Sequence, residues 1–429
     1  MLARLRNHGD ALGSIGLRAA GVGFGFLLSV FIGVRWGAET AGLYALVTQT
    51  AMFLSVVAVG GLDLALVRHF GKSAGRQRVA ARSQLSALAM TVLLAGVVIG
   101  LLFLLGPGVR NWLTGTPLTG FALAIMMVLL VARALTRSLS AILRVQRRFL
   151  LAQAVEIVFI PMFVTGALLA GWLHSPDALL IATAIAAAAA VGIGLATMVR
   201  GMAARSELPT TRVSIVTLLA TGGSLWAVAV ALNLADWYGL ATVASVGGLD
   251  AAGVFRVAAQ VAAALGIIST GLFGVYTARM SAAFGGDDLE ELGRLYRQAT
   301  KISIALIVPA TLFLAILAEP LLAFVGPEFA TGTTTLRILL AGQLIATVMG
   351  PAGMMLAMTG NEKSNLRISL ISIVLLVVAA PLLGDVMGAA GVALAIALAQ
   401  AGRNITSAWF VWRKFGMAPV SSLRSRTWS

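Results

Sequence analysis

Six arginine residues lie within long apolar stretches of the sequence, where charged groups are costly. They are Arg18, Arg133, Arg137, Arg256, Arg337 and Arg403. On the most lenient scale an arginine at a bilayer centre costs about 2.5–3.5 kcal/mol, so five of them facing lipid would cost about 12–18 kcal/mol. Arg337 lies near the end of its stretch and is expected to extend to the interface. We expect the other five to face a hydrated cavity or to pair with acids.

Acidic side chains are fewer in these stretches, where Asp63, Glu156 and Asp236 stand against the six arginines. Arg133 and Arg137 are four residues apart, so they share one helix face. A net basic interior favours an anionic ligand, and the guanidinium fork suits phosphate. Each residue also has a structural interpretation as an ion-pair member, and Asp236 could orient an arginine, bind hydroxyls or accept a proton. The predicted binding residues are Arg18, Arg133, Arg137, Arg256 and Asp236, with Glu156, Asp63 and Arg403 as possible charge partners. Glu156 is a candidate partner of Arg133 or Arg137.

Residues typical of catalysis or metal binding are scarce. The chain has no cysteine, and its histidines, His8, His69 and His174, are far apart. No thiolate chemistry is therefore available, and neither a histidine metal site nor a catalytic triad is expected. We predict a protein without cofactor or metal that is not an enzyme.

The elements that carry these residues are apolar helices. The chain of 429 residues is 59% hydrophobic and 11% charged, whereas soluble domains are about 25% charged. About 20 apolar residues span a bilayer as a helix. Twelve such runs are expected, at residues 11–34, 43–67, 85–105, 120–143, 150–172, 178–199, 213–240, 251–278, 302–325, 335–358, 368–383 and 389–411. The prediction is an all-α polytopic membrane protein with short connections.

Basic residues set the orientation. Of the 31 lysine and arginine residues, 23 fall on one side of the predicted spans and two, Arg35 and Arg110, on the other. The basic side is cytoplasmic by the positive-inside rule, so both termini are predicted to be cytoplasmic. The net charge of +15 is thus explained by topology rather than by nucleic acid. Tryptophans at predicted helix ends are expected to form the interfacial belt; they are Trp36, Trp112, Trp172, Trp237, Trp409 and Trp412.

An internal repeat divides the chain into halves. Residues 37–44 (GAETAGLY) resemble residues 248–255 (GLDAAGVF) at an offset of 211, and each segment lies between the first two spans of a six-span set. We therefore predict an N-terminal six-helix lobe at 1–205 and a C-terminal one at 206–429. Transporters with parallel repeats of this kind bind substrate between the halves.

Several short segments follow one another in a characteristic order along the spans: residues 36–46 (WGAETAGLYAL), 60–68 (GGLDLALVR), 143–149 (LRVQRRF), Asp236, 253–258 (GVFRVA), 358–363 (MTGNEK) and 388–393 (GAAGVA). Together they resemble the polysaccharide-biosynthesis flippases of the multidrug/oligosaccharidyl-lipid/polysaccharide exporter superfamily. Phe255-Arg256 departs from the Tyr followed by a variable residue that is usual in that family.

The resemblance implies two pseudo-symmetric lobes around a central cavity, alternating access, and a bacterial inner-membrane location. It also implies a polyprenyl-diphosphate-linked oligosaccharide as cargo, carried to the outer leaflet for O-antigen or exopolysaccharide assembly. A polysaccharide polymerase and chain-length proteins are possible partners besides membrane lipid. A cation-coupled multidrug exporter and a cell-wall-precursor flippase of the same superfamily remain alternatives, as does a scaffold that does not transport.

Overall fold

The structure, a computed structural model, describes residues 2–71, 78–203, 210–211 and 213–419. Among the basic residues used to predict orientation, Lys72, Arg76, Arg205, Arg212, Arg424 and Arg426 lie outside the described residues. The predicted lobe boundary after residue 205 lies there as well. Helices dominate the described ranges, and the two strands found in them are two residues long each.

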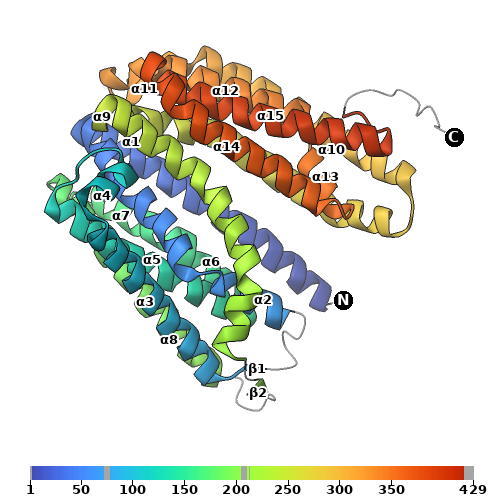
Figure 1. Cartoon of the computed structure of the whole chain (residues 1–429), viewed down its shortest axis with the longest axis horizontal. Helices are drawn as coiled ribbons and strands as arrows, with labels where there is room; N and C mark the ends of the chain where they lie inside the picture. Colours follow the sequence, from blue (N-terminus) through green and yellow to red (C-terminus); the bar gives the residue numbers. More distant parts are fainter. Residues whose placement is uncertain (1, 72–77, 204–209, 212, 420–429) are drawn as a thin grey trace. The chain divides into compact units, whose positions relative to one another are not determined.

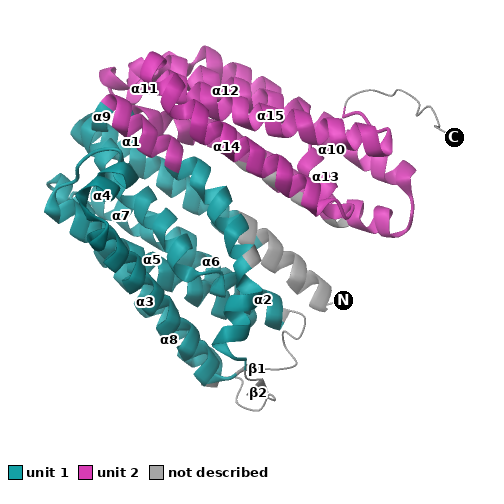
Figure 2. Ribbon diagram, viewed as in Figure 1, with its two compact units in different colours: residues 1–237, 248–253 teal, residues 238–247, 254–429 magenta. Residues whose placement is uncertain are grey.

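The described helices group into two compact units (Figure 2). Unit 1 comprises residues 1–237 and 248–253, and unit 2 comprises residues 238–247 and 254–429. The elements that lie wholly in unit 1 are α1 (Leu2–Val59), α2 (Leu62–Gly71), β1 (Arg78–Val79), α3 (Ala81–Leu104), α4 (Gly106–Thr114), α5 (Gly120–Val145), α6 (Phe149–Gln153), the π-helical segment η1 (Ala154–Val158), α7 (Phe159–Leu169), α8 (Pro176–Ala203) and β2 (Thr210–Thr211). Helix α9 (Ile215–Gly285) has residues in both units, so the division differs from the predicted lobes, which stay a prediction.

The long helices α1 and α9, labelled in Figure 1, are each interrupted at the glycine that opens one copy of the internal repeat. Gly37 interrupts α1 with φ 80° and ψ −177°, and Gly248 interrupts α9 with φ 77° and ψ −171°. This backbone conformation is nearly exclusive to glycine because a Cβ would clash. The two copies of the repeat therefore end one apolar run and begin the next in the same way.

Several of the helices are long enough to span a membrane. Within the described residues, eight helices are long and apolar enough to cross a membrane, or nine if a bent pair counts as one span. Two of the eight, Gly16–Val59 with 44 residues and Leu225–Phe273 with 49, contain the glycine breaks, so each holds parts of two predicted runs. The chain is thus an all-α polytopic membrane protein, as its composition predicts.

Helix α5 lies at the centre of unit 1. It packs against α1, α2, α3 and α8, while α7 packs against α1 and α8. The β1–β2 pairing is parallel and joins Arg78 to Thr210 and Val79 to Thr211. Because α5 is surrounded by helices, polar residues on it meet protein groups from several elements.

A glycine turn separates α1 from α2. Gly60 and Gly61 both have positive φ, 60° and 76°, and Gly61 lies so close to Gly222 that a Cβ would come within 2.5 Å of the Gly222 carbonyl oxygen. The indole Nε1 of Trp226 donates to the carbonyls of Val56 and Val57 at 3.2 and 3.1 Å. These carbonyls lie in the last turn of α1, where an unsatisfied carbonyl would be costly in an apolar environment, and that of Val57 also accepts the N–H of Gly60 at 3.2 Å. The turn directs α2, and Asp63 at its start, toward α5.

Trp237 is a correction to the predicted tryptophan belt. Its side chain is buried, at 3% exposure, and its ring stacks on Phe53 with centroids 4.4 Å apart. Its Nε1 donates to Thr50 Oγ1 and to the Leu113 carbonyl, both at 3.2 Å. A hydrogen-bonded indole inside unit 1 is a packing element, since interfacial tryptophans keep one edge in water.

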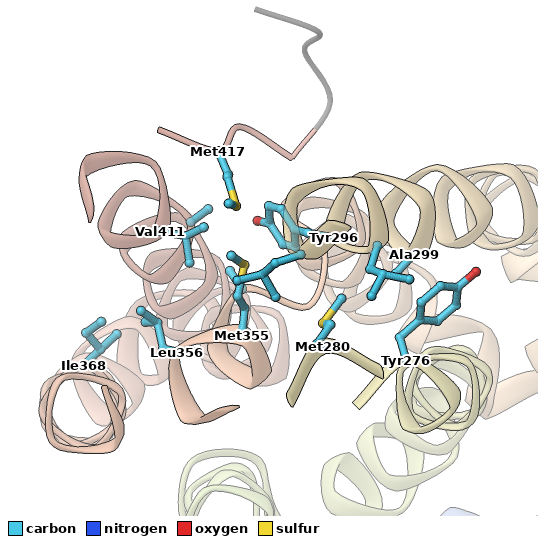
Figure 3. Packing of buried hydrophobic residues seen from close by; sticks show 13 residues of the cluster. Tyr276, Met280, Tyr296, Ala299, Met355, Leu356, Ile368, Val411 and Met417 are labelled. Carbon is cyan, nitrogen blue, oxygen red and sulfur yellow. The ribbon is translucent and has the colours of Figure 1, made fainter. Parts of the chain in front are cut away.

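Unit 2 is built around its last helix. Its further elements are α10 (Leu289–Ile316), α11 (Ala318–Val325), the 3-10 segment η2 (Pro327–Gly332), α12 (Thr333–Val348), α13 (Ala352–Met358), α14 (Glu362–Met387) and α15 (Ala389–Phe415). Helix α15 packs against α12, α13 and α14. Figure 3 shows a methionine-rich core in which Tyr276, Tyr296, Met280, Met355 and Met417 come together. The Tyr296 hydroxyl donates to the Met349 carbonyl at 2.9 Å, which satisfies its one buried polar group.

Candidate functional site

A polar stripe runs along one face of α5. Arg133, Arg137, Ser140 and Arg144 follow one another at spacings of four, three and four residues, which stack side chains on the same face of a helix. The helix extends to Val145, whereas the sequence predicts its end at 143 and places Arg144 in a loop. The stripe therefore contains one more guanidinium than predicted.

Asp63 supplies the first carboxylate that meets this stripe. Its Oδ2 lies 3.1 Å from NH2 of Arg137, with exposures of 12% and 21% for the two side chains. Its Oδ1 accepts the backbone N–H of Leu64 at 2.9 Å, which fixes the carboxylate at the start of α2. Nε of Arg137 is buried and has no partner among the described residues. The pair is thus a single-contact ion pair, and a buried guanidinium donor remains unused.

Glu156 supplies the second carboxylate. Its Oε2 accepts from NH2 of Arg144 at 2.5 Å and from Oγ of Ser140 at 2.6 Å. The sequence suggested Arg133 or Arg137 as its partner, so the pairing is corrected to Arg144. This arrangement anchors the C-terminal part of the stripe, Ser140 and Arg144, to η1.

Arg133 meets Glu156 in a different way. Its NH1 donates to the backbone carbonyl of Glu156 at 3.3 Å. Glu156 lies in the π-helical segment, where the N–H of Phe159 bonds to the carbonyl of Ala154, five residues back. Residue 161, five positions after Glu156, is a proline and has no N–H to offer the Glu156 carbonyl in a π register. That carbonyl accepts a hydrogen bond from the Arg133 guanidinium.

Glycine allows α1 to approach the same segment. A Cβ on Gly21 would lie 3.2 Å from the carbonyl oxygen of Ile157 and 2.6 Å from its Cγ2. Oγ1 of Thr165 donates to the Phe24 carbonyl at 3.2 Å, which ties α7 to α1 one turn further along. The glycine-rich run of α1, residues 21–25 (GVGFG), therefore allows α1 to pack closely against the π-helical segment η1.

The charges of this network do not cancel. Three guanidinium groups, those of Arg133, Arg137 and Arg144, stand against the two carboxylates of Asp63 and Glu156, which leaves one positive charge. Among the described residues Arg133 belongs to no ion pair. Its electrostatic neighbours are Tyr44, Glu156 and Arg137. The excess charge is therefore centred on the half-buried Arg133.

The network just described includes none of the other predicted residues. Arg18 is exposed on α1, and Asp236 is exposed on the part of α9 that belongs to unit 1. Arg256 and Arg403 are half-buried and belong to unit 2. Of the predicted set, the structure brings together Arg133, Arg137, Asp63 and Glu156.

Three residues of the network were missed by sequence reasoning. Ser140 and Arg144 continue the spacing of Arg133 and Arg137, and the 4-3-4 pattern could have identified them. Tyr44 lies near Arg133 and accepts from Oγ1 of Thr183 at 3.4 Å. Tyr44 is the last residue of the first repeat segment, and the corresponding residue of the second segment is Phe255. The tyrosine hydroxyl is therefore a difference between the two copies that is visible in the sequence. Among the described residues there is no cluster of three or more histidine, cysteine or acidic side chains that could hold a metal ion.

Comparison with known proteins agrees with this architecture. The MatE family model matches residues 227–382. An inward-facing multidrug resistance MATE family transporter of the MOP superfamily has a TM-score of 0.70 at 15% identity, covering 92% of this chain and 94% of that one. The inward closed lipid II flippase MurJ also has 0.70, at 13% identity, covering 94% and 87%. No curated protein matches the chain by sequence.

A third structural neighbour is described by the polarity of its own binding pocket. A MOP superfamily transporter from Pyrococcus furiosus, described as having a binding pocket of reverse polarity that suggests a different function, has a TM-score of 0.60 at 15% identity. The alignment covers 94% of this chain and 95% of that one. These neighbours are transporters and a flippase rather than enzymes, and their likeness confirms the predicted fold class.

Proposed function

We propose that the chain is a flippase for a polyprenyl-diphosphate-linked oligosaccharide, which it moves from the cytoplasmic to the outer leaflet by alternating access. The observation that carries this proposal is Arg133, a half-buried guanidinium whose hydrogen bond goes to a neutral carbonyl. The cargo would serve the assembly of O-antigen or exopolysaccharide in the inner membrane of a bacterium.

An anionic ligand follows from the energetics of Arg133. A guanidinium within a span costs a few kcal/mol unless water, an acid or a ligand compensates it. One N–H of Arg133 is used by the Glu156 carbonyl, and the guanidinium carries several more donors. Arg137, one turn away, adds a donor without a partner at its Nε. Two neighbouring guanidinium groups with free donors match the oxygens of a diphosphate better than a single carboxylate.

The likeness to multidrug exporters supports a second candidate, a cation-coupled exporter. That function requires carboxylates free to hold a cation or proton. In unit 1, the carboxylates of the network, Asp63 and Glu156, are each paired with an arginine. The site as built therefore favours an anion over a cation.

The likeness to a lipid II flippase supports a third candidate, a cell-wall-precursor flippase. Its TM-score equals that of the multidrug transporter, so the fold does not separate them. The twelve runs of this sequence favour a polysaccharide flippase, because the cell-wall-precursor flippases that it resembles carry two additional helices. The cargo of a polysaccharide flippase and that of a cell-wall-precursor flippase differ in the sugar attached to the lipid. The sugar that is transported therefore decides between these two candidates.

The direction of transport follows from the cargo charge. With both termini in the cytoplasm, an interior-negative potential favours outward movement of an anion by about 2.3 kcal/mol per charge per 100 mV. A polymerase and chain-length proteins would act on the cargo after it reaches the outer leaflet.

A reconstituted flipping assay tests the proposal. Purified protein in liposomes is given three labelled probes: a polyprenyl-diphosphate oligosaccharide, the corresponding monophosphate lipid, and a cationic dye. We expect the diphosphate lipid to appear in the opposite leaflet fastest, with a rate that rises with an imposed potential. Faster export of the dye, driven by a Na⁺ or proton gradient, would instead identify a multidrug exporter.

A further inference from the structure

Helix α15 carries an arginine in the middle of its length. Arg403 is the fifteenth residue after Gly388, which ends α14, and α14 is a candidate span of 26 residues that packs against α15. Arg403 is therefore level with the middle of α14, inside the predicted span and not at its end. Its side chain is half-buried and, among the residues that the structure describes, makes neither a hydrogen bond nor an ion pair.

Arg403 does not belong to the exposed face of its helix. Leu398, Ile405, Trp409 and Trp412 are exposed and follow one another at spacings of seven, four and three residues, so they form one apolar stripe along α15. Arg403 precedes Ile405 by two residues, which places it about 160° around the helix from that stripe. A guanidinium on the side away from the apolar stripe faces protein or water rather than lipid.

Unit 2 offers no carboxylate at this depth among its described residues. Its acids stand in the first or last turns of helices, in η2 or in the connection between α9 and α10. Helices α12, α13 and α14, which pack against α15, carry only Glu362, the first residue of α14, and Asp385 in its last turn. A charge within the membrane needs water or an opposite charge. Balancing Arg403 is therefore left to water or to an anionic ligand.

Three amide side chains accompany this arginine. Gln400, one turn before Arg403, donates from Nε2 to Oε1 of Gln343 on α12 at 2.9 Å. Asn404, the next residue after Arg403, donates from Nδ2 to the Gln400 carbonyl at 2.8 Å. All three amides are half-buried. The arginine thus stands in a polar segment of an otherwise apolar helix pair.

Close approach of α12 and α15 brings the amides of the two helices together. Gly342 precedes Gln343, and a Cβ on this glycine would lie 2.9 Å from Cα of Ala397, one turn before Gln400. A larger residue at position 342 would force the helices apart and break the amide pair. The polar segment is therefore held in place by the packing of unit 2.

Each amide uses one end in these bonds and keeps the other. Among the described residues, Oε1 of Gln400, Nε2 of Gln343 and Oδ1 of Asn404 make no hydrogen bond. The remaining set contains acceptors and donors, and a sugar hydroxyl can serve both because it donates and accepts. The guanidinium of Arg403 adds a fork that matches the two oxygens of a carboxylate.

We propose that Arg403, Gln343, Gln400 and Asn404 form a subsite of unit 2 that binds an acidic sugar, with the guanidinium on the carboxylate and the amides on the hydroxyls. The inference rests on the proposed function, which supplies a glycan as the ligand. The carboxylate gives Arg403 the opposite charge that unit 2 lacks at this depth. The subsite recognises the sugar, whereas the network at Arg133 is proposed to recognise the diphosphate.

Binding of free sugars to the purified full chain tests the subsite without transport. Saturation-transfer difference NMR in detergent compares glucuronate with glucose, which lacks the carboxylate, and with acetate, which lacks the hydroxyls. We expect glucuronate to bind about tenfold more tightly than either, because the charge-assisted bonds and the amide contacts are both needed. Equal binding of glucuronate and glucose, or of glucuronate and acetate, would overturn the proposal.

Three variants assign this binding to the subsite. Arg403→Gln should weaken glucuronate about tenfold, the loss of one charge-assisted hydrogen bond, without lowering the melting temperature, since it removes an uncompensated charge. Gln343→Met removes an amide of similar shape and should weaken glucuronate while leaving acetate unchanged. Arg413→Gln is the matched control, an exposed arginine at the end of the same helix, and should bind glucuronate as the native chain does. Undiminished glucuronate binding by Arg403→Gln would overturn the proposal.

Transport separates this inference from the proposed function. Liposomes receive two polyprenyl-diphosphate disaccharides that differ only in ending with glucuronate or with glucose. The native chain should move the acidic lipid about tenfold faster, and Arg403→Gln should lose this preference while still moving the glucose lipid. Equal native rates would contradict the subsite and leave the flippase function standing. Movement of neither lipid would contradict the flippase function, and the binding of free glucuronate would then decide on the subsite alone.

Discussion

Gly42 and Gly253 face each other so closely that neither position has room for a side chain. A Cβ on Gly42 would overlap with the carbonyl oxygen of Leu249, and a Cβ on Gly253 would overlap with that of Ala38. Each would also lie 2.9 Å from the backbone nitrogen of the other glycine. Since the two repeat segments are offset by 211 residues, Gly42 corresponds to Gly253 and Ala38 to Leu249. The contact is therefore symmetric between the two copies of the repeat.

This contact predicts a stability loss for Gly42→Ala and Gly253→Ala. The added methyl groups meet backbone atoms, which cannot move aside as a side chain tip can, so each variant should lose about 1–3 kcal/mol. Thermal unfolding of the detergent-solubilised protein measures the effect. Gly96→Ala in α3 is the matched control, because nothing lies within 4 Å of its Cβ position. It should be neutral or slightly stabilising, and an equal loss in all three variants would contradict the packing argument.

The ion pair between Asp63 and Arg137 predicts coupled effects of two substitutions. Asp63→Asn leaves the partly buried guanidinium of Arg137 without its counter-charge. Arg137→Gln leaves the carboxylate of Asp63 without its counter-charge. The double variant D63N/R137Q removes both charges. Its loss of unfolding free energy should therefore be about 1–3 kcal/mol smaller than the sum of the losses of the two single variants. Unfolding of all three proteins by denaturing detergent gives this difference. Strictly additive losses would show that the pair does not form in solution.

Pro161 predicts a variant in which structure and function separate. Pro161→Ala supplies the N–H that the π register lacks, and alanine is a better helix former than proline by about 3 kcal/mol in a helix interior. The protein should be at least as stable as the native chain. The Glu156 carbonyl would then be taken by the backbone, so Arg133 loses its orienting acceptor and flipping should slow. A variant that is both less stable and fully active would contradict this account of the π-helical segment.

Sequence reasoning predicted the helices well because lipid imposes length and composition on every span. It also found the repeat, since a glycine break such as Gly37 or Gly248 leaves a visible signature. It misplaced Arg144 because a hydropathy run ends at the first charge, whereas the helix continues to Val145. It took Trp237 for an interfacial residue because position along a span does not reveal which face is buried. The partner of Glu156 depends on the register of a π-helical turn, which no pattern of residue types specifies.

The most direct test of the central claim is the flipping rate of a polyprenyl-diphosphate oligosaccharide by Arg133 variants in liposomes. Arg133→Gln keeps a hydrogen-bond donor for the Glu156 carbonyl but removes the charge, and Arg35→Gln is the control at an exposed arginine. The account predicts at least a tenfold slower rate for Arg133→Gln at unchanged protein yield, partial recovery for Arg133→Lys, and a native rate for Arg35→Gln. A native rate for Arg133→Gln would contradict it.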